Sequence, residues 1–127
     1  MPPEEVPKAR VLVVDRHEAD RLLFSKVLSR AGFEVIEAAR GVEAVTALSL
    51  YPCELVLLEI GIEAEELDGI AAVRALSPVP IIAVAPDISA RRRALSAGCA
   101  LCLVKPVDIR RLPSRVRALL CGGGSSR

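Results

Sequence analysis

In the stretch ELVLLEI, residues 54–60, an unbroken run of four apolar residues is followed directly by the carboxylate of Glu59. Residues 55–58 are all Leu or Val, and neighbouring side chains of a strand point to opposite faces of its sheet. A run with no polar member therefore predicts a strand that is buried on both faces, as in a parallel sheet between two helix layers. Glu59 follows this strand directly, which makes it the first candidate for a functional group.

Similar apolar runs alternate with helical spacing along the whole chain. The expected strands are residues 10–15, 33–38, 53–60, 80–86 and 100–106, and the expected helices are residues 20–32, 41–50, 67–76, 89–98 and 110–120. Five strands alternating with five helices predict an α/β fold, in which a five-stranded parallel sheet carries helices on both faces. The polarity of residues 33–38 alternates, so this strand is expected at an edge of the sheet.

The core faces of the first two helices are predicted from large apolar residues at helical spacing. These residues are Leu23, Val27 and Leu28 in the first helix and Val42, Val45 and Leu48 in the second. The last helix contains Pro113 in its fifth position if it begins at Asp108, a good N-cap. Proline there crowds the carbonyl of Ile109, so we expect a loosened first turn and a regular helix from about Pro113.

Length and composition limit the organisation and the function. The 127 residues suit one domain, which we place at residues 9–120, between a flexible leader at 1–8 and a flexible tail or linker at 121–127. A net charge of +1 and an aromatic content of 2% exclude a nucleic-acid footprint and an affinity for acidic membranes. No apolar run reaches the roughly 18 residues of a membrane span, and no signal peptide is visible, so we expect a cytoplasmic domain.

The four cysteines are expected to be small buried residues in a reducing compartment, and not a disulfide framework. They are Cys53, Cys99, Cys102 and Cys121. Cys99 and Cys102 form a C-x-x-C pair, but this pair enters a strand and not a helix N-terminus, so we interpret it as core packing.

Ligands of parallel sheets bind at the carboxyl ends of the strands. The residues that stand there in this chain are Asp15 and Arg16, Glu59, Ala85, and Lys105. We expect them to meet at one edge of the sheet. His17 lies in the turn after the first strand, where a single histidine is usually a solvated loop residue.

These segments, in this order, resemble the receiver domain of two-component response regulators. The resemblance rests on VLVVDRHEADRLL (11–23), AGFEVIEAARGVEAV (31–45), ELVLLEI (54–60) followed by LDG (67–69), VPIIAVAP (79–86) and GCALCLVKPVD (98–108). It implies the flavodoxin-like (βα)5 fold over residues 9–120. In that family a histidine kinase phosphorylates an Asp at the end of the third strand. Two acids after the first strand hold Mg²⁺ together with this acceptor, a Ser or Thr and a Lys contact the phosphoryl group, and an aromatic on the fifth strand acts as a switch.

The chain departs from this pattern at most of these positions. Asp15 matches the first acid and Lys105, followed by the cis-prone Pro106, matches the lysine. The other positions are changed: Arg16 stands for the second acid, Glu59 for the acceptor, Ala85 for the hydroxyl residue and Cys102 for the aromatic switch. The loop from Glu59 to Asp68 is also about two residues longer than the family's pattern implies.

Each change weakens ordinary phosphotransfer. Glu is longer than Asp by one C–C bond, about 1.5 Å, so its carboxylate is out of register with a site built for Asp. Arg16 repels Mg²⁺, and Ala85 has no hydroxyl to donate. We therefore predict no metal ligand set and no cofactor. We also hypothesise that Arg16 takes the place of the metal while Lys105 and Arg16 hold Glu59 as a weak imitation of a phosphorylated acceptor.

Two functions follow from different classes. The first is a phosphorylation-independent signalling and protein-interaction module, with no enzyme activity. The alternative is a phosphoacceptor domain that takes phosphate from a histidine kinase, with Mg²⁺, and hydrolyses it slowly. A flavodoxin-like cofactor binder is disfavoured because DRHEAD (15–20) stands where a Ser-, Thr- or Gly-rich phosphate loop would follow the first strand.

Arginines gather on the two helices that, in receiver domains, contribute to the partner-binding face. They are Arg91, Arg92, Arg93, Arg110 and Arg111, with Arg115 and Arg117 further along the last helix. Like charges disfavour symmetric pairing. We therefore expect a monomer, or a dimer through another face, and a protein partner with an acidic surface or a histidine kinase.

Overall fold

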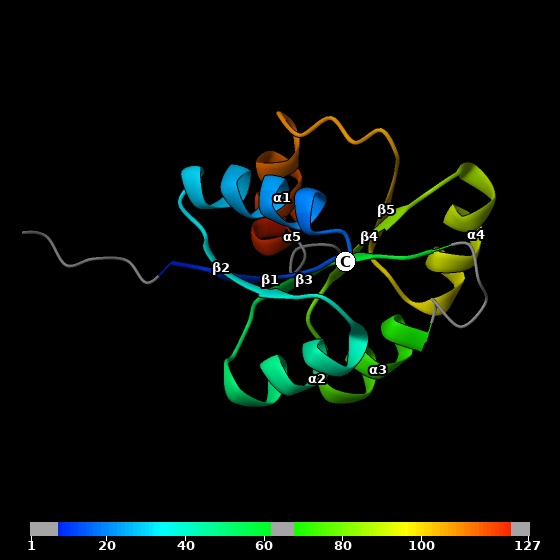
Figure 1. Ribbon diagram of the computed structural model, residues 1–127, viewed down its shortest axis with the longest axis horizontal. Helices are drawn as coiled ribbons and strands as arrows, with labels where there is room; N and C mark the ends of the chain where they lie inside the picture. Colours follow the sequence, from blue (N-terminus) through cyan, green and yellow to red (C-terminus); the bar gives the residue numbers. More distant parts are fainter. Residues whose placement is uncertain (1–7, 62–67, 123–127) are drawn as a thin grey trace, which may run out of the picture.

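The computed structural model describes residues 8–61 and 68–122 of the chain. Along it lie β1 (Arg10–Val14), α1 (Glu18–Arg30), β2 (Glu34–Ala38), α2 (Gly41–Leu50), β3 (Leu55–Glu59), α3 (Asp68–Leu76), β4 (Ile81–Ala85), α4 (Ile88–Ala97), β5 (Leu101–Val104) and α5 (Leu112–Gly122). The strands pair in parallel in the order β2-β1-β3-β4-β5 (Figure 1). The predicted five-stranded parallel sheet is confirmed, and β2 lies at an edge, as its alternating polarity predicts.

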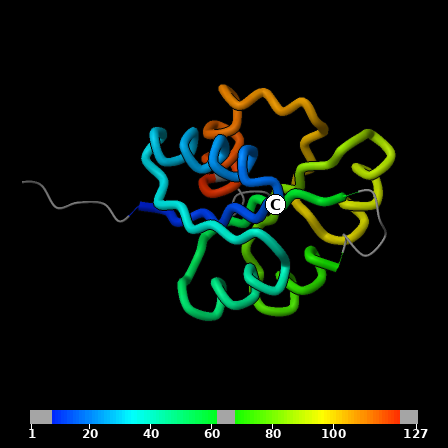
Figure 2. The backbone as a smooth tube through the Cα atoms, in the orientation of Figure 1, coloured from blue at the N-terminus to red at the C-terminus, as the bar shows by residue number. Residues whose placement is uncertain are grey.

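Helices cover both faces of this sheet, as the tube in Figure 2 also shows. On one face, α1 and α5 bury Phe24, Leu28, Leu112 and Val116 against the strands. On the other face, α2, α3 and α4 bury a second set of small and branched residues: Ala44, Ala47, Ile70, Val73, Ala90 and Ala94. The sheet is thus the middle layer of three, which is the arrangement that continuous apolar strands require.

β3 supplies side chains to both layers. Leu55 and Leu57 pack on the side of α1 and α5, whereas Val56 and Leu58 pack on the side of α2, α3 and α4. The alternation of a strand then directs Glu59 towards the α1 and α5 side. The sequence of β3 therefore decides which face receives its carboxylate.

The predicted core faces of α1 and α2 were wrong in part. In α1, Leu23 is 43% exposed, and Phe24 is buried beside it. In α2, Val42 is 80% exposed, and the buried positions are Ala44 and Ala47. Ranking candidates by apolar size fails for a helix that packs through its smallest side chains.

The alanine face of α2 packs beside α3. A Cβ added at Gly41, the first residue of α2, would lie 3.9 Å from the Cα of Gly69 in α3, an ordinary van der Waals contact. Large side chains on this side of α2 would hold the helices apart, whereas Ala44 and Ala47 let them meet. Leu48 packs against the same core and is partly buried.

The start of α5 confirms the prediction from Pro113. The regular helix begins at Leu112, which places Pro113 at its second position, where a missing N–H leaves no helical bond unmade. Asp108 does not cap this helix, because its Oδ1 accepts from the backbone N–H of Arg110, 3.2 Å away, within the preceding turn. The structure describes neither residues 1–7 of the predicted leader nor residues 123–127 of the predicted tail.

Within residues 8–61 and 68–122, no helix is both long enough and apolar enough to cross a membrane.

Candidate functional site

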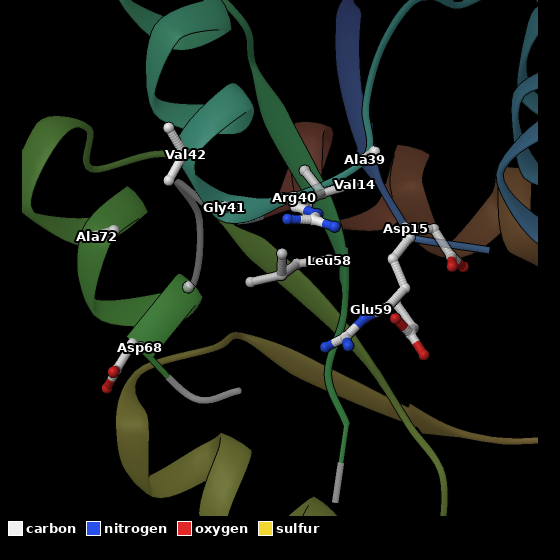
Figure 3. Close-up of a pocket in the computed structure, with 12 residues that line it drawn as sticks. Val14, Asp15, Ala39, Arg40, Gly41, Val42, Leu58, Glu59, Asp68 and Ala72 are labelled. Atoms are coloured by element: carbon white, nitrogen blue, oxygen red, sulfur yellow. The ribbon is translucent and has the colours of Figure 1, made fainter. Parts of the chain in front are cut away.

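The register of β1 and β3 brings two acids together at the carboxyl edge of the sheet. Val14 of β1 is paired with Leu58 of β3, so the next residue of each parallel strand, Asp15 and Glu59, stands side by side with the other. Both are largely withdrawn from solvent, since 1% of the side chain of Asp15 and 8% of that of Glu59 is exposed. Figure 3 shows the two carboxylates on the same side of the adjoining pocket.

Asp15 satisfies only part of its hydrogen-bonding capacity. Its Oδ1 accepts a hydrogen bond of 2.8 Å from the backbone N–H of His17, which fixes the turn after β1. Its Oδ2 is buried and has no hydrogen-bond partner among the residues that the structure describes. A buried carboxylate oxygen without a donor is unusual in a folded protein and marks a place where a ligand can be accepted.

His17 lies against both acids. Its Nδ1 is 3.4 Å from Oδ1 of Asp15 and 3.6 Å from Oε2 of Glu59. His17 is a loop residue with 59% of its side chain exposed, as expected, but the sequence did not predict that its imidazole lies beside both acids. The bond from Asp15 to the backbone of His17 turns the chain so that the imidazole reaches back over the strand ends.

Lys105 follows β5 and pairs with two carboxylates. Its Nζ lies 3.5 Å from Oε2 of Glu59 and 3.5 Å from Oδ2 of Asp20, in the first turn of α1. The backbone N–H of Lys105 donates to the carbonyl of Ala85 over 2.9 Å, which ties the end of β5 to the end of β4. The predicted proximity of Glu59 and Lys105 is confirmed, and the peptide bond from Lys105 to Pro106 is cis.

Electrostatics at Glu59 are unbalanced. Burial, followed by the negative charge of Asp15, raises the pKa of Glu59 above its ordinary value, and Lys105 and His17 oppose this rise without cancelling it. The carboxylate therefore receives less positive charge than its burial and its acidic neighbour require.

A pocket of about 750 Å³ opens beside the two acids. Its lining comes from β1, β3, α2 and α3 and from the loops after β1 and before α2: Val14, Asp15, Arg16, Ala39, Arg40, Gly41, Val42, Leu58, Glu59, Asp68, Gly69 and Ala72. In Figure 3, Val42, Asp68 and Ala72 stand on the side opposite the acids. Arg16 thus lines the same pocket as Glu59, and a pairing of the two side chains stays a prediction. Most of the longer loop predicted after Glu59, residues 62–67, lies outside the described residues.

The positions of the hydroxyl and of the aromatic switch are buried and apolar. Ala85 is 0% exposed at the end of β4, and its side chain offers no donor. Cys102 is buried in β5, and burial together with the neighbouring Cys99 raises its pKa to about 11. Burial also raises the pKa of Cys99 and of Cys53, so these thiols pack as small apolar groups, whereas Cys121 is exposed, contrary to expectation.

The predicted partner face is exposed and basic. Its arginines stand on α4 and before α5: Arg91, Arg92, Arg93, Arg110 and Arg111. Asp108 pairs with Arg110 at 3.5 Å and with Arg111 at 3.7 Å, so one acid partly offsets two of these charges. Arg91 and Arg115 also line a groove of about 370 Å³ that runs past Cys102.

The residues that the sequence missed are His17 and Asp20. Both lie in the stretch DRHEAD, within six residues of the end of β1. The sequence did contain a signal for Asp20. It is an acid in the first turn of α1, and the first turn of a helix that follows a strand lies at the carboxyl edge of the sheet.

The residues of this site do not fit Mg²⁺. Mg²⁺ requires near-octahedral oxygen ligands, usually two carboxylates and several waters. Here the two acids share their space with an imidazole and an ammonium group, and Arg16 stands on the pocket wall.

A model of the family described as "response regulator receiver domain" matches residues 11–117. The probable transcriptional regulator ycf27 of Cyanophora paradoxa is 35% identical over 121 residues, which cover 91% of this chain and 50% of that protein. The transcriptional regulatory protein PrrA of Mycobacterium tuberculosis is 33% identical over 127 residues, which cover 95% of this chain and 54% of that protein. The chain thus spans about half the length of these relatives.

Solved structures agree with the fold. A response regulator from Thermotoga maritima superimposes with a TM-score of 0.80 at 25% identity and covers 90% of this chain and 98% of its own. A CheY-like receiver domain protein from Methanospirillum hungatei superimposes with a TM-score of 0.84 at 23% identity, covering 95% of this chain and 100% of its own. The (βα)5 flavodoxin-like arrangement predicted from the sequence is confirmed.

Proposed function

This chain belongs to the response regulator receiver domain family, and we propose that it acts there as a phosphorylation-independent signalling module. Receiver domains are signalling modules, and we propose no enzyme activity and no Mg²⁺ cofactor for this one. The observation that carries the proposal is the state of the acceptor position. Glu59 is held 3.5 Å from Lys105, beside an alanine where the family places a hydroxyl.

The held carboxylate supports a fixed state of the domain. In the family's cycle, a phosphoryl group arrives at the acceptor and pairs with the lysine and the hydroxyl. Here the lysine is already paired with the acceptor side chain, which has a single negative charge, whereas a phosphoryl group carries about −1.5 to −2. Glu59 and Lys105 then supply a weak, permanent form of the contact that phosphorylation would make.

The exposed arginines support recognition by an acidic protein surface. Arg91, Arg92 and Arg93 all lie exposed on α4, and rim charges of this kind mainly govern the rate and the partner of association. We propose a protein partner with an acidic face or a histidine kinase, no nucleic acid, and a cytoplasmic location. Repulsion between like faces also supports a monomer, or a dimer through other elements.

A phosphoacceptor function is the second candidate, and the presence of Asp15 and Lys105 favours it. Under that alternative a kinase would phosphorylate the domain, with Mg²⁺, and the phosphoryl group would be hydrolysed slowly. The missing hydroxyl alone predicts a loss of roughly 10²–10³ in rate.

Incubation of the full chain with acetyl phosphate and Mg²⁺, followed by intact mass measurement, separates the two functions. The interaction module predicts no added phosphoryl group. Addition of one phosphoryl group to most of the protein, lost after Glu59→Gln substitution, would establish the phosphoacceptor instead.

A further inference from the structure

We propose that Asp15, His17 and Glu59 form a binding site for a divalent transition-metal ion of the Zn²⁺ type. One ligand atom from each of the three side chains can be chosen so that all lie within 4.8 Å of one another. The ligand set differs from the all-oxygen set that the family resemblance implies, because Arg16 occupies the second acidic position and an imidazole joins from the next residue. The sequence alone predicted no metal ligands because it did not place His17 among the acids.

The distances suit a small tetrahedral ion. Two ligand atoms on one tetrahedral Zn²⁺ lie roughly 3.4 Å apart when each bond is about 2.1 Å. Nδ1 of His17 is 3.4 Å from Oδ1 of Asp15 and 3.6 Å from Oε2 of Glu59. These two edges of the site have about the required length, and the three ligand atoms all lie within 4.8 Å of one another.

Asp15 provides the independent sign that the site accepts a ligand. Its side chain is 1% exposed, Oδ2 has no hydrogen-bond partner among the described residues, and Oδ1 of the same carboxylate lies 3.4 Å from Nδ1 of His17. A buried carboxylate oxygen is normally satisfied by a donor, and a metal ion satisfies it as well. His17 is 59% exposed, so an ion can enter from solvent past the imidazole.

Lys105, the cation beside the site, has a second carboxylate partner. Lys105 is 3.5 Å from Glu59, but also 3.5 Å from Asp20, so the lysine keeps a carboxylate partner when Glu59 turns to an ion. Repulsion by Arg16 acts on every divalent cation alike. His17 therefore decides selectivity, because imidazole is a good ligand for Zn²⁺, Ni²⁺ and Cu²⁺ and a poor one for Mg²⁺.

The single histidine of the chain makes a direct test available. The imidazole C–H resonances in the proton–carbon NMR spectrum of the metal-free full chain belong to His17 alone. One equivalent of Zn²⁺ is expected to shift or broaden them, whereas a large excess of Mg²⁺ leaves them unchanged. Unchanged resonances with Zn²⁺ would overturn the site.

Calorimetric titration with Zn²⁺ gives the stoichiometry and the ligands. We expect one ion per chain, with affinity reduced at least about tenfold by His17→Gln and by Glu59→Gln. Glu18→Gln, which removes an exposed acid next to His17, and Cys121→Ser, which removes the exposed thiol, should leave affinity unchanged. Because His17 is largely exposed, His17→Gln should fold, and circular dichroism checks this. Binding that persists in His17→Gln and disappears in Cys121→Ser would overturn the proposal.

This inference rests on the proposed function only in that both treat the pocket as unfit for Mg²⁺-dependent phosphorylation. The two fail separately. Absence of Zn²⁺ binding leaves the phosphorylation result untouched, and phosphorylation by acetyl phosphate refutes the interaction module without altering the Zn²⁺ titration.

Discussion

Nζ of Lys105 lies 3.5 Å from Oε2 of Glu59, across the carboxyl ends of β5 and β3. The lysine side chain is 31% exposed and that of the glutamate 8%, so this ion pair is neither a surface contact nor a fully buried one. Its strength lies between those two limits. The pair joins the acceptor position to the one cation that this chain shares with the family's pattern.

Loss of the lysine should destabilise the fold by leaving Glu59 without the ammonium group that lies 3.5 Å from it. We expect Lys105→Met to lower the free energy of unfolding by about 1–3 kcal/mol, as for a partly buried ion pair. Asp20→Asn removes the other partner of Lys105, and because Asp20 is 43% exposed the loss should stay below about 1 kcal/mol. Urea unfolding measures both, and equal losses would contradict the dominance of Glu59.

A double variant tests the same pair by a second route. Lys105→Met with Glu59→Gln removes both charges, so it should recover much of the stability that Lys105→Met alone loses. Additive effects of the two substitutions would show that the 3.5 Å contact carries no coupling energy.

The raised pKa of Glu59 predicts a pH dependence of stability. A carboxyl whose pKa is raised in the folded protein binds its proton more tightly there, so its contribution is present in acid and is lost as the pH rises through the folded pKa. Glu59→Gln has no such titration. Its stability relative to the parent should therefore increase between about pH 4 and pH 7, in urea unfolding with a chelator present. A difference that is independent of pH would contradict the unbalanced charge at Glu59.

Restoring the family's pattern should restore Mg²⁺ binding. Arg16→Asp returns a second acid, Glu59→Asp shortens the acceptor and Ala85→Thr returns a hydroxyl. The triple variant should bind Mg²⁺ in calorimetric titration, whereas the parent should show no sub-millimolar affinity. A parent with sub-millimolar affinity for Mg²⁺ would contradict the effect assigned to Arg16.

The basic partner face predicts the oligomeric state. Exposed arginines on α4 and before α5 should repel their counterparts in a second copy, so light scattering at micromolar concentration should give a monomer. Crosslinking should detect no homodimer through α4 and α5. A dimer through these helices that withstands high salt would show that the face pairs by apolar contact.

The fold and the position of the site at the carboxyl edge of the sheet could be predicted from the sequence, because continuous runs of Leu and Val indicate buried strands. The run at residues 55–58 predicts a central strand, and its alternation predicts the side on which Glu59 emerges. The proximity of Glu59 and Lys105 follows from the general rule that parallel strands end at one edge. The start of α5 could likewise be predicted from Pro113, because proline has no N–H to donate and is tolerated only in the first turn of a helix.

The missing parts depend on local geometry that composition does not encode. His17 reaches the acids because its backbone N–H donates a hydrogen bond to Asp15, which fixes the turn after β1. The presence of a single histidine in the sequence does not predict this turn. The face of α2 was misplaced because Ala44 and Ala47 contribute little to an apolar pattern, although they are the buried residues and Val42 is 80% exposed. Large apolar residues therefore do not identify the buried face of a helix that packs through alanines.

The central claim, that the acceptor position is held and not phosphorylated, is tested most directly in one mixed reaction. The parent and the triple variant Arg16→Asp, Glu59→Asp, Ala85→Thr are incubated together with acetyl phosphate and Mg²⁺, and intact masses are recorded over time. The variant should gain one phosphoryl group while the parent mass stays unchanged. A phosphoryl group on the parent, acquired as fast as on the variant, would contradict it.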